Sequence, residues 1–372
     1  MDRVGCGSED ITLLTMSKSD NPDGCPQGAP TSITSAHKGV QKQTAKLLQA
    51  VMLLLTSVSA YGKIHWPIQG HPIPRNKPVE TVIQATSSGK PESGLFGCVR
   101  NSGYKFHEGL DIKSQKRDRY NRPLDKVVAV MPGRVAYINK VGGKSSYGIY
   151  VILEHPQESP KVYSLYAHLA SVDKAVTKGK SMAGGEVLGI MGHTASTGIP
   201  RSRAHLHFEI GLKVTDNFQS WYNAQKFKSK NEHGVWNGMN MVGLDVLDFF
   251  RKAADGKIHN MKDYFRTVPE AFRLRVRTDK TPDLVKRYPG LLTSTAPSQP
   301  AGWDIAWSWY GMPTKITPLY PKTTPAGPDI QVLKMNKTLL ALSKCRATLS
   351  KTGDEVKLGS HLKHYLTLMF DY

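Results

Sequence analysis

The stretch Ala204-His205-Leu206-His207-Phe208-Glu209-Ile210-Gly211-Leu212 alternates in side-chain character with a period of two. This is the period of a β-strand, in which residues i and i+2 point to the same side. His205 and His207 therefore project together, while Leu206 and Phe208 point the opposite way into a core. Two adjacent imidazoles repel if both are protonated, and a bound metal, which requires neutral imidazole, removes that repulsion. The stretch predicts a strand carrying metal ligands, although two packed or surface histidines would give the same pattern.

Two further segments carry side chains of the same chemistry. The first is His107-Glu108-Gly109-Leu110-Asp111, where Gly109 and the following Ile112 favour a loop running into a strand over a helix. The second is Tyr166-Ala167-His168-Leu169. His107, Asp111 and one histidine of the pair would offer two nitrogens and one oxygen and leave a fourth position for water, as in catalytic zinc sites. Only 4 Cys in 372 residues also disfavour a structural zinc.

Short apolar-alternating runs surround these segments and indicate the fold class. They cover residues 127–131, 134–138, 148–155, 162–169, 186–191 and 204–212. Several short strands at close spacing, without helical patterns between them, predict a mainly β protein with an antiparallel sheet. Pro132-Gly133 predicts a hairpin turn between the first two strands. We expect this domain to span residues 95–212.

Residues 38–60 have the composition of a secretion signal. Three lysines precede a mostly apolar stretch that ends in small residues, with Val58 and Ala60 at the spacing of a cleavage site. An uncleaved anchor or a buried core helix would fit the same stretch. The polar residues 1–37 predict a disordered leader or a mis-assigned start, and residues 61–94, rich in Pro, Ser, Thr and Lys, predict an extended lead-in.

Cleavage after this signal would remove Cys6 and Cys25 and leave Cys98 and Cys345. Two cysteines in an exported protein can form one bridge, but the sequence does not fix the distance between them. Cys98 has two other interpretations, ordinary packing or a thiolate that approaches the metal.

The charge is strongly positive, at +20, with 50 Lys and Arg against 30 Asp and Glu. The excess is spread along the chain and indicates either a basic surface or a polyanionic partner such as nucleic acid, anionic lipid or an acidic cell wall. We expect no nucleic-acid partner, because no reader motif is present. The apolar fraction of 39% is enough for a core and excludes global disorder. No apolar run reaches the roughly 20 residues of a membrane-spanning helix.

The spacing of apolar residues is less regular beyond residue 213. Residues 242–253 have helical spacing, residues 281–330 are rich in Pro and predict irregular structure, residues 331–349 predict an amphipathic helix, and residues 365–372 predict a short strand. This region could be a wall-targeting module, an inhibitory segment over the groove or structural support for the sheet.

Residues 96–209 resemble the M23 family of zinc metallopeptidases, the LytM/lysostaphin type that cuts peptidoglycan cross-links. The matching motifs occur in the family's order. They are Phe96-Gly97, His107-Glu108-Gly109-Leu110-Asp111-Ile112, Pro132-Gly133-x-Val135, Gly148-Ile149-Tyr150-Val151-x-Leu153-x-His155, Tyr166-Ala167-His168-Leu169, Gly189-x-Met191-Gly192 and His205-Leu206-His207-Phe208-Glu209.

The resemblance implies that His107, Asp111 and His207 ligate Zn²⁺. It implies that His168 and His205 are non-ligand catalytic groups, of which one takes the proton of a zinc-activated water and the other donates to the oxyanion or the leaving amine. The sequence does not assign these two roles. The implied fold is an antiparallel sheet beneath a substrate groove.

Three features near these motifs stay open. The six residues 199–204 between Gly198 and the His-x-His pair depart from the family's shorter turn, and we expect them to lengthen a loop at the groove. Glu209 is either a hydrogen-bond partner of a ligand histidine or a solvated carboxylate. Tyr166 is either an oxyanion donor or a tyrosine of the strand core.

We therefore expect an exported zinc metalloendopeptidase that hydrolyses peptide bonds of peptidoglycan cross-links in the periplasm or cell envelope of a bacterium, or after secretion. Its expected partners are the peptide stems and cross-bridges, with anionic envelope polymers as a further possibility. Two alternatives remain: a non-catalytic wall-binding or activator protein of the same fold, and a zinc peptidase that acts on a non-wall protein.

Overall fold

The computed structural model describes residues 63–372 apart from residues 76, 322, 323, 325, 353, 354, 371 and 372. The expected leader and secretion signal, residues 1–60, lie outside the described residues. Within the described part of the chain, no helix is both long enough and apolar enough to cross a membrane.

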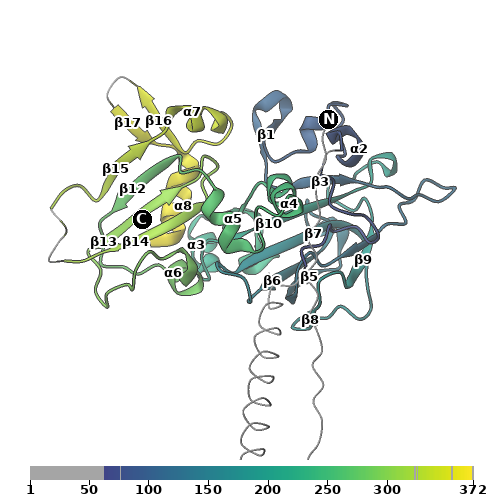
Figure 1. Ribbon diagram of the computed structural model, residues 1–372, viewed down its shortest axis with the longest axis horizontal. Coiled ribbons are helices and arrows are strands. Elements are labelled where there is room, and N and C mark those ends of the chain that lie inside the picture. The colour runs from purple at the N-terminus through teal and green to yellow at the C-terminus, as the bar shows by residue number, and fades with distance from the viewer. Residues whose placement is uncertain (1–62, 76, 322–323, 325, 353–354, 371–372) are drawn as a thin grey trace, which may run out of the picture. The chain divides into compact units, whose positions relative to one another are not determined.

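A nine-stranded antiparallel sheet forms the larger part of the structure (Figure 1). Six strands follow one another in the order β11-β10-β7-β6-β5-β8, while β3 pairs with β10 and β9 pairs with both β4 and β7. Their bounds are β3 Leu110–Lys113, β4 Lys126–Val128, β5 Gly133–Asn139, β6 Ile149–His155, β7 Val162–Val172, β8 Ser181–Met182, β9 Val187–Met191, β10 His205–Lys213 and β11 Met241–Gly243. The prediction of a mainly β, antiparallel fold is confirmed.

Strand β10 is the strand that the alternating stretch predicts, and all nine of its residues are buried. It lies between β3 and β7, with His207 directly opposite Asp111 on one side and opposite Ala167 on the other. The register therefore brings the predicted histidine and carboxylate segments to the same place in the sheet.

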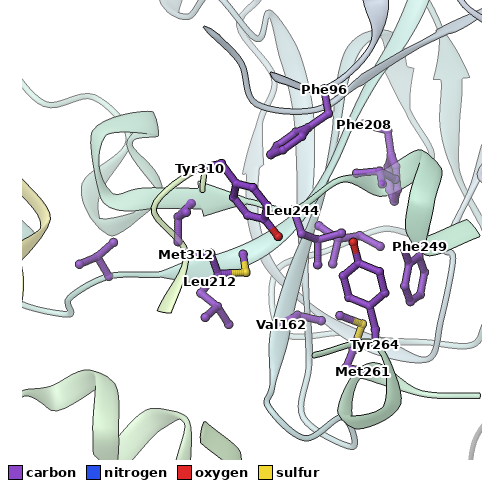
Figure 2. Close-up of a cluster of buried hydrophobic side chains, with 14 of the residues drawn as sticks. Phe96, Val162, Phe208, Leu212, Leu244, Phe249, Met261, Tyr264, Tyr310 and Met312 are labelled. Carbon is purple, nitrogen blue, oxygen red and sulfur yellow. The ribbon is translucent and has the colours of Figure 1, made fainter. Parts of the chain in front are cut away.

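The two faces of β10 bury different chemistry. Leu206 and Phe208 are fully buried on one face, where Phe208 meets Phe250 of helix α4 (Val246–Ala254) at 5.8 Å between ring centroids. Figure 2 shows this cluster of apolar side chains, with Phe208, Leu244 and Phe249 near one another. A second, smaller apolar cluster includes Tyr163 and Leu165 of β7, the latter paired with Glu209. The predicted division into a polar and a core face is confirmed.

The predicted hairpin at Pro132-Gly133 is wrong. β4 pairs with β9, and β5 pairs with β6 and β8, so the two strands on either side of this turn are not partners. Beyond the end of β4 the backbone of Ala129 bonds with Gly185 and Glu186. Pro132 has no N–H to give to a ladder, and its carbonyl instead accepts from His155 Nδ1 at 2.8 Å.

Two short strands precede the main sheet and form a small ribbon of their own, β1 (Gly97–Arg100) and β2 (Lys105–His107). The expected extended lead-in contains more structure than predicted. It includes the single helical turn α2 (Val79–Val82) and a 3-10 turn over residues 91–94.

The C-terminal region contains a second antiparallel sheet in the order β14-β13-β12-β15, together with short helices (Figure 1). The remaining bounds are α3 Phe218–Ala224, α5 Met261–Thr267, β12 Phe272–Val276, α6 Asp283–Arg287, β13 Gly302–Trp307, β14 Pro313–Leu319, β15 Ile330–Met335, α7 Lys337–Leu340, β16 Leu349–Thr352, β17 Glu355–Leu358 and α8 Ser360–Phe370.

Three predictions for this region are wrong. Residues 281–330 are not irregular, because alternating Trp303, Ile305 and Trp307 build β13, and the prolines of β14 are tolerated at the edge of the sheet. Residues 331–349 are not one helix, because β15 pairs with β12 and Asn336 then caps the separate turn α7. Residues 365–370 of the predicted terminal strand belong to helix α8, and residues 371–372 lie outside the described residues.

The helical character of α8 follows from the spacing of its apolar residues. Leu362, Tyr365, Leu366 and Met369 are buried at positions i, i+3, i+4 and i+7. The helix predicted over residues 242–253 starts later, at Val246, because Asp245 caps it by accepting from Asp248 N while residues 241–243 pair with β10.

Candidate active site

Three predicted ligand side chains converge at the polar face of β10. His107 ends β2, Asp111 lies in β3 and His207 lies in β10. His207 Nδ1 lies 3.0 Å from both Asp111 Oδ1 and His107 Nε2, and His107 Nε2 lies 3.2 Å from Asp111 Oδ1. All three residues are buried and form the one group among the described residues with the spacing of a metal site. Donor atoms about 2.0–2.1 Å from a tetrahedral zinc lie about 3.3 Å apart, so the triangle fits that ion.

The hydrogen bonds around this triangle explain why it suits a cation. His107 Nδ1 donates to Leu95 O at 2.7 Å, and His207 Nε2 donates to Glu209 Oε1 at 2.8 Å. When both rings are neutral, these N–H groups are directed outward, and His107 Nε2 and His207 Nδ1 present bare lone pairs to each other and to the Asp111 carboxylate. Three lone pairs that meet in a buried place repel unless a positive charge lies between them.

The electrostatics of the individual groups agree with this preference. Burial alone would lower the pKa of His207, but its hydrogen bonds with Asp111 and Glu209 raise it to about 9. Burial alone would raise the pKa of Asp111, yet attraction to His107 and His205 holds it well below its usual value. The site therefore keeps a carboxylate ionised in a buried place and favours positive charge beside it.

Glu209 is a buried hydrogen-bond partner of His207, so its interpretation as a solvated carboxylate is wrong. Besides His207, it accepts from Tyr147 Oη and from Tyr163 Oη, each at 2.8 Å. Three donors on one buried carboxylate compensate its desolvation and fix the orientation of the His207 ring.

His168 and His205 lie beside the triangle, with their rings 4.8 Å apart between centroids. Each donates Nδ1–H to a backbone carbonyl, His168 to Thr194 O at 2.8 Å and His205 to Arg203 O at 2.7 Å. Their Nε2 atoms are thereby left as bases, and that of His205 lies 3.5 Å from Asp111 Oδ1. Burial, with repulsion from His205 and His207, lowers the pKa of His168 to about 3 and keeps it neutral.

The backbone of His168 is itself unusual. Its φ is +60°, in the left-handed region that non-glycine residues rarely adopt. Its N–H donates to Tyr147 O at 2.9 Å, which holds the residue in this conformation. A backbone conformation of this kind costs free energy and persists only where the surrounding structure holds it. Residues in such conformations cluster at functional sites.

A cavity of about 310 Å³ opens onto this cluster. All five predicted site residues line it, and the predicted loop 199–204 contributes Ile199 and Arg203. A buried group of candidate ligands, two neutral imidazoles beside it and an open cavity above it are the parts that a metal-assisted hydrolysis needs.

Comparisons with known proteins agree with this geometry. Residues 105–219 match the family model described as "Peptidase family M23". The chain contains an M23 peptidase domain. The matched residues include all five histidine and aspartate positions of the site, and the predicted resemblance is confirmed. No curated protein matches the chain.

Several solved structures are similar to this chain. One, described as a glycyl-glycine endopeptidase LytM of Ruminococcus gnavus, is 18% identical over 62% of this chain and 76% of its own, with a TM-score of 0.31. The catalytic domain of lysostaphin from Staphylococcus simulans is 17% identical over 42% and 87%, with a TM-score of 0.26. A zinc-containing peptidase of Vibrio cholerae is 21% identical over 41% and 33%, with a TM-score of 0.22. At these identities and TM-scores, the solved structures do not assign a substrate to this chain.

Besides the Leu95 carbonyl, two side chains of the candidate site were not predicted from the sequence. Arg100 donates to Asp111 Oδ2 from the neighbouring ribbon, and Tyr147 reaches Glu209 from the loop before β6. Both depend on contacts between distant segments. Of the two interpretations of Tyr166, the structure agrees with a tyrosine of the strand core. Its hydroxyl is buried and accepts from Val130 N at 2.9 Å.

Cys98 and Cys345 form a disulfide across 247 residues of sequence. This answers the question that the sequence left open and excludes Cys98 as a thiolate near the metal. Because Cys98 lies in β1 with Arg100, the bridge ties the ribbon beside the M23 site to the C-terminal region.

Proposed function

We propose that this protein is an exported zinc metalloendopeptidase that hydrolyses peptide cross-links of peptidoglycan. The observation that carries the proposal is the convergence of His107 Nε2, His207 Nδ1 and Asp111 Oδ1 in the cavity of an M23 domain. When bound there, zinc would polarise the scissile carbonyl and lower the pKa of a water molecule toward neutrality.

The remaining chemistry belongs to the chain's own residues. His168 and His205 each present a bare Nε2 on the cavity side, so one of them can take the proton of the attacking water and then give that same proton to the leaving amine. Glu209 and the Leu95 carbonyl hold the ligand histidines in the required tautomer. Arg100 neutralises the outer oxygen of Asp111.

The peptidoglycan substrate is supported by the sequence motifs shared with the LytM/lysostaphin type. Export to the cell envelope is supported by the signal-like residues 38–60 and by the disulfide, which is typical of oxidising compartments. A charge of +20 would help retain the enzyme on anionic envelope polymers.

For the domain organisation, we propose residues 95–212 as the catalytic unit and structural support as the role of residues 213–372. β11 extends the main sheet beside β10, and α4 covers its apolar face. Among the described residues, none beyond His207 lines the cavity, which argues against an inhibitory segment lying in it.

The test is loss of turbidity of purified peptidoglycan with the full chain, with added zinc, with a chelator, and with His205→Ala. We expect lysis that needs zinc, releases free amines without new reducing sugar ends, and falls about 10²–10³-fold in the variant. His259→Ala is a matched control, because His259 is exposed and lies outside the cavity lining.

Other outcomes separate the alternatives. Hydrolysis of casein without lysis of any wall preparation would indicate a zinc peptidase with a non-wall substrate. Failure to bind one equivalent of zinc would contradict catalysis and leave the wall-binding or activator protein.

A further inference from the structure

The loop of residues 199–204, which precedes β10, places a cation in the cavity. Arg203, in the 3-10 turn over residues 201–203, lines the cavity together with His205. Its carbonyl accepts the Nδ1–H of His205 at 2.7 Å. One loop residue therefore orients an imidazole through its backbone and presents a guanidinium to the same space.

This guanidinium has no partner within the described chain. Arg203 is half-buried, and its side chain makes no hydrogen bond or ion pair with another described residue. Lys105, which lines the same cavity, is likewise unpaired among the described residues. By contrast, Arg100 in this lining is bonded to Asp111. A partly desolvated cation without a partner favours a ligand that carries an anion.

The net charge of the cavity lining also favours an anionic ligand. Five of its lining residues are charged: Arg100, Lys105, Glu108, Asp111 and Arg203. Arg100 and Asp111 neutralise each other, which leaves two cations against Glu108. The cavity is thus net positive before any metal is counted, and it suits a substrate with negative charge near the reacting bond.

The loop is braced and does not need the ligand to order it. Arg117 Nη1 donates to Arg201 O at 2.8 Å, and its Nη2 donates to Ala204 O at 3.1 Å. On the other side, His193 Nδ1 donates to Ile199 O at 2.8 Å. A guanidinium on a fixed backbone loses less entropy when it binds a carboxylate than one on a free loop.

We propose that Arg203 binds a free carboxylate of the peptide substrate, within a few bonds of the peptide bond that is cut. This rests on the proposed function and narrows its substrate class. Bridges made of glycine alone carry no such group, so the inference favours cross-links between stem peptides that retain an ionised carboxylate. The planar guanidinium would pair with that carboxylate through two parallel hydrogen bonds.

The experiment compares two soluble cross-linked peptides that differ only in one group beside the scissile bond, a carboxylate or a carboxamide. We expect the full chain to show a kcat/KM about 10–100-fold higher for the carboxylate peptide. Arg203→Met should remove that preference by lowering the kcat/KM of the carboxylate peptide to about that of the carboxamide peptide. Arg201→Met is the matched control, because it removes a charge from the same turn but not from the cavity lining, and it should keep the preference.

Two results would overturn the inference: equal rates for both peptides in the unmodified chain, or a preference that survives Arg203→Met. Binding of the same peptides, followed by fluorescence anisotropy, separates this outcome from failure of the proposed function. Binding of the carboxylate peptide that depends on Arg203 without hydrolysis would support the inference and contradict the peptidase. Neither hydrolysis nor Arg203-dependent binding would overturn both.

Discussion

Each histidine of the site has one nitrogen committed to a fixed acceptor and the other free. His107, His168 and His205 use backbone carbonyls for this purpose, whereas His207 uses a carboxylate, Glu209. A backbone acceptor survives most substitutions, but Glu209 is a single side chain on which the tautomer of a proposed ligand depends. This makes Glu209 the most informative residue to change.

Glu209→Gln should weaken zinc binding by about 10–100-fold, because an amide holds the N–H of His207 less strongly than a carboxylate does. Competition with a fluorescent chelator measures this. Glu154→Gln is the control, since Glu154 is exposed on β6. An unchanged zinc affinity in Glu209→Gln would contradict the proposed role.

His168→Ala should separate catalysis from metal binding. We expect one zinc per chain to remain bound while the rate falls by about 10²–10³-fold, because a proton-transfer group is lost and no ligand is removed. Metal content by atomic absorption and hydrolysis of wall peptides give the two readings. Loss of the zinc itself would place His168 among the ligands.

The sequence singles out the residues that the proposed chemistry requires, but not those that only position them. His205 and His207 follow from a period of two and His107 and Asp111 from donor type, so their shared site follows from local patterns. Leu95, Arg100 and Tyr147 contribute a carbonyl, a guanidinium and a hydroxyl, which nearly any segment offers. Leu95 contacts His107, Arg100 contacts Asp111 and Tyr147 contacts Glu209, and no local pattern encodes these contacts.

At the level of elements, strands were predictable where both sheet faces are buried. β6, β7 and β10 carry strong apolar alternation, and their predicted bounds agree with the structure to within about three residues at each end. Three of the errors concern elements of the C-terminal region. There, β15 has no buried residue and so shows no clear period, whereas the helical spacing of α8 begins at Leu362, outside the segment 365–372 predicted as a strand.

The connection between β2 and β3 sets the distance between His107 and Asp111. Gly109 lies in it, and a Cβ there would collide with Phe208 O and lie 2.9 Å from Glu209 Cγ. Gly109→Ala should therefore lower the free energy of unfolding by about 1–3 kcal/mol and weaken zinc binding as well.

Urea denaturation and chelator competition test both effects of Gly109→Ala. Gly143→Ala is the matched control, because a Cβ at Gly143 has no neighbour within 4 Å. Equal stability and equal zinc affinity of Gly109→Ala and Gly143→Ala would contradict this prediction. Close packing at Gly109 would then have no role in positioning His107 and Asp111.

At the scale of the whole molecule, the Cys98–Cys345 disulfide closes a long loop between β1 and the C-terminal region. Restricting the unfolded chain in this way stabilises a folded protein by about 2–5 kcal/mol. The double variant Cys98→Ser/Cys345→Ser should lose a free energy of unfolding in that range, as measured by urea denaturation.

A reductant provides the control for this prediction. It should destabilise the unmodified protein by a similar amount and leave the double variant unaffected. Equal sensitivity of the two proteins to reductant would show that the bridge does not contribute to stability.

The same disulfide has a consequence for the order in which the molecule is completed. Cys345 follows Cys98 by 247 residues, so a ribosome must make this whole intervening stretch before the thiol that Cys98 requires exists. The cytosol keeps thiols reduced, whereas an oxidising compartment joins them. A preparation made in the cytosol of a bacterial host would therefore yield the untethered form, and material for structural or kinetic work should be produced by secretion or oxidised after purification.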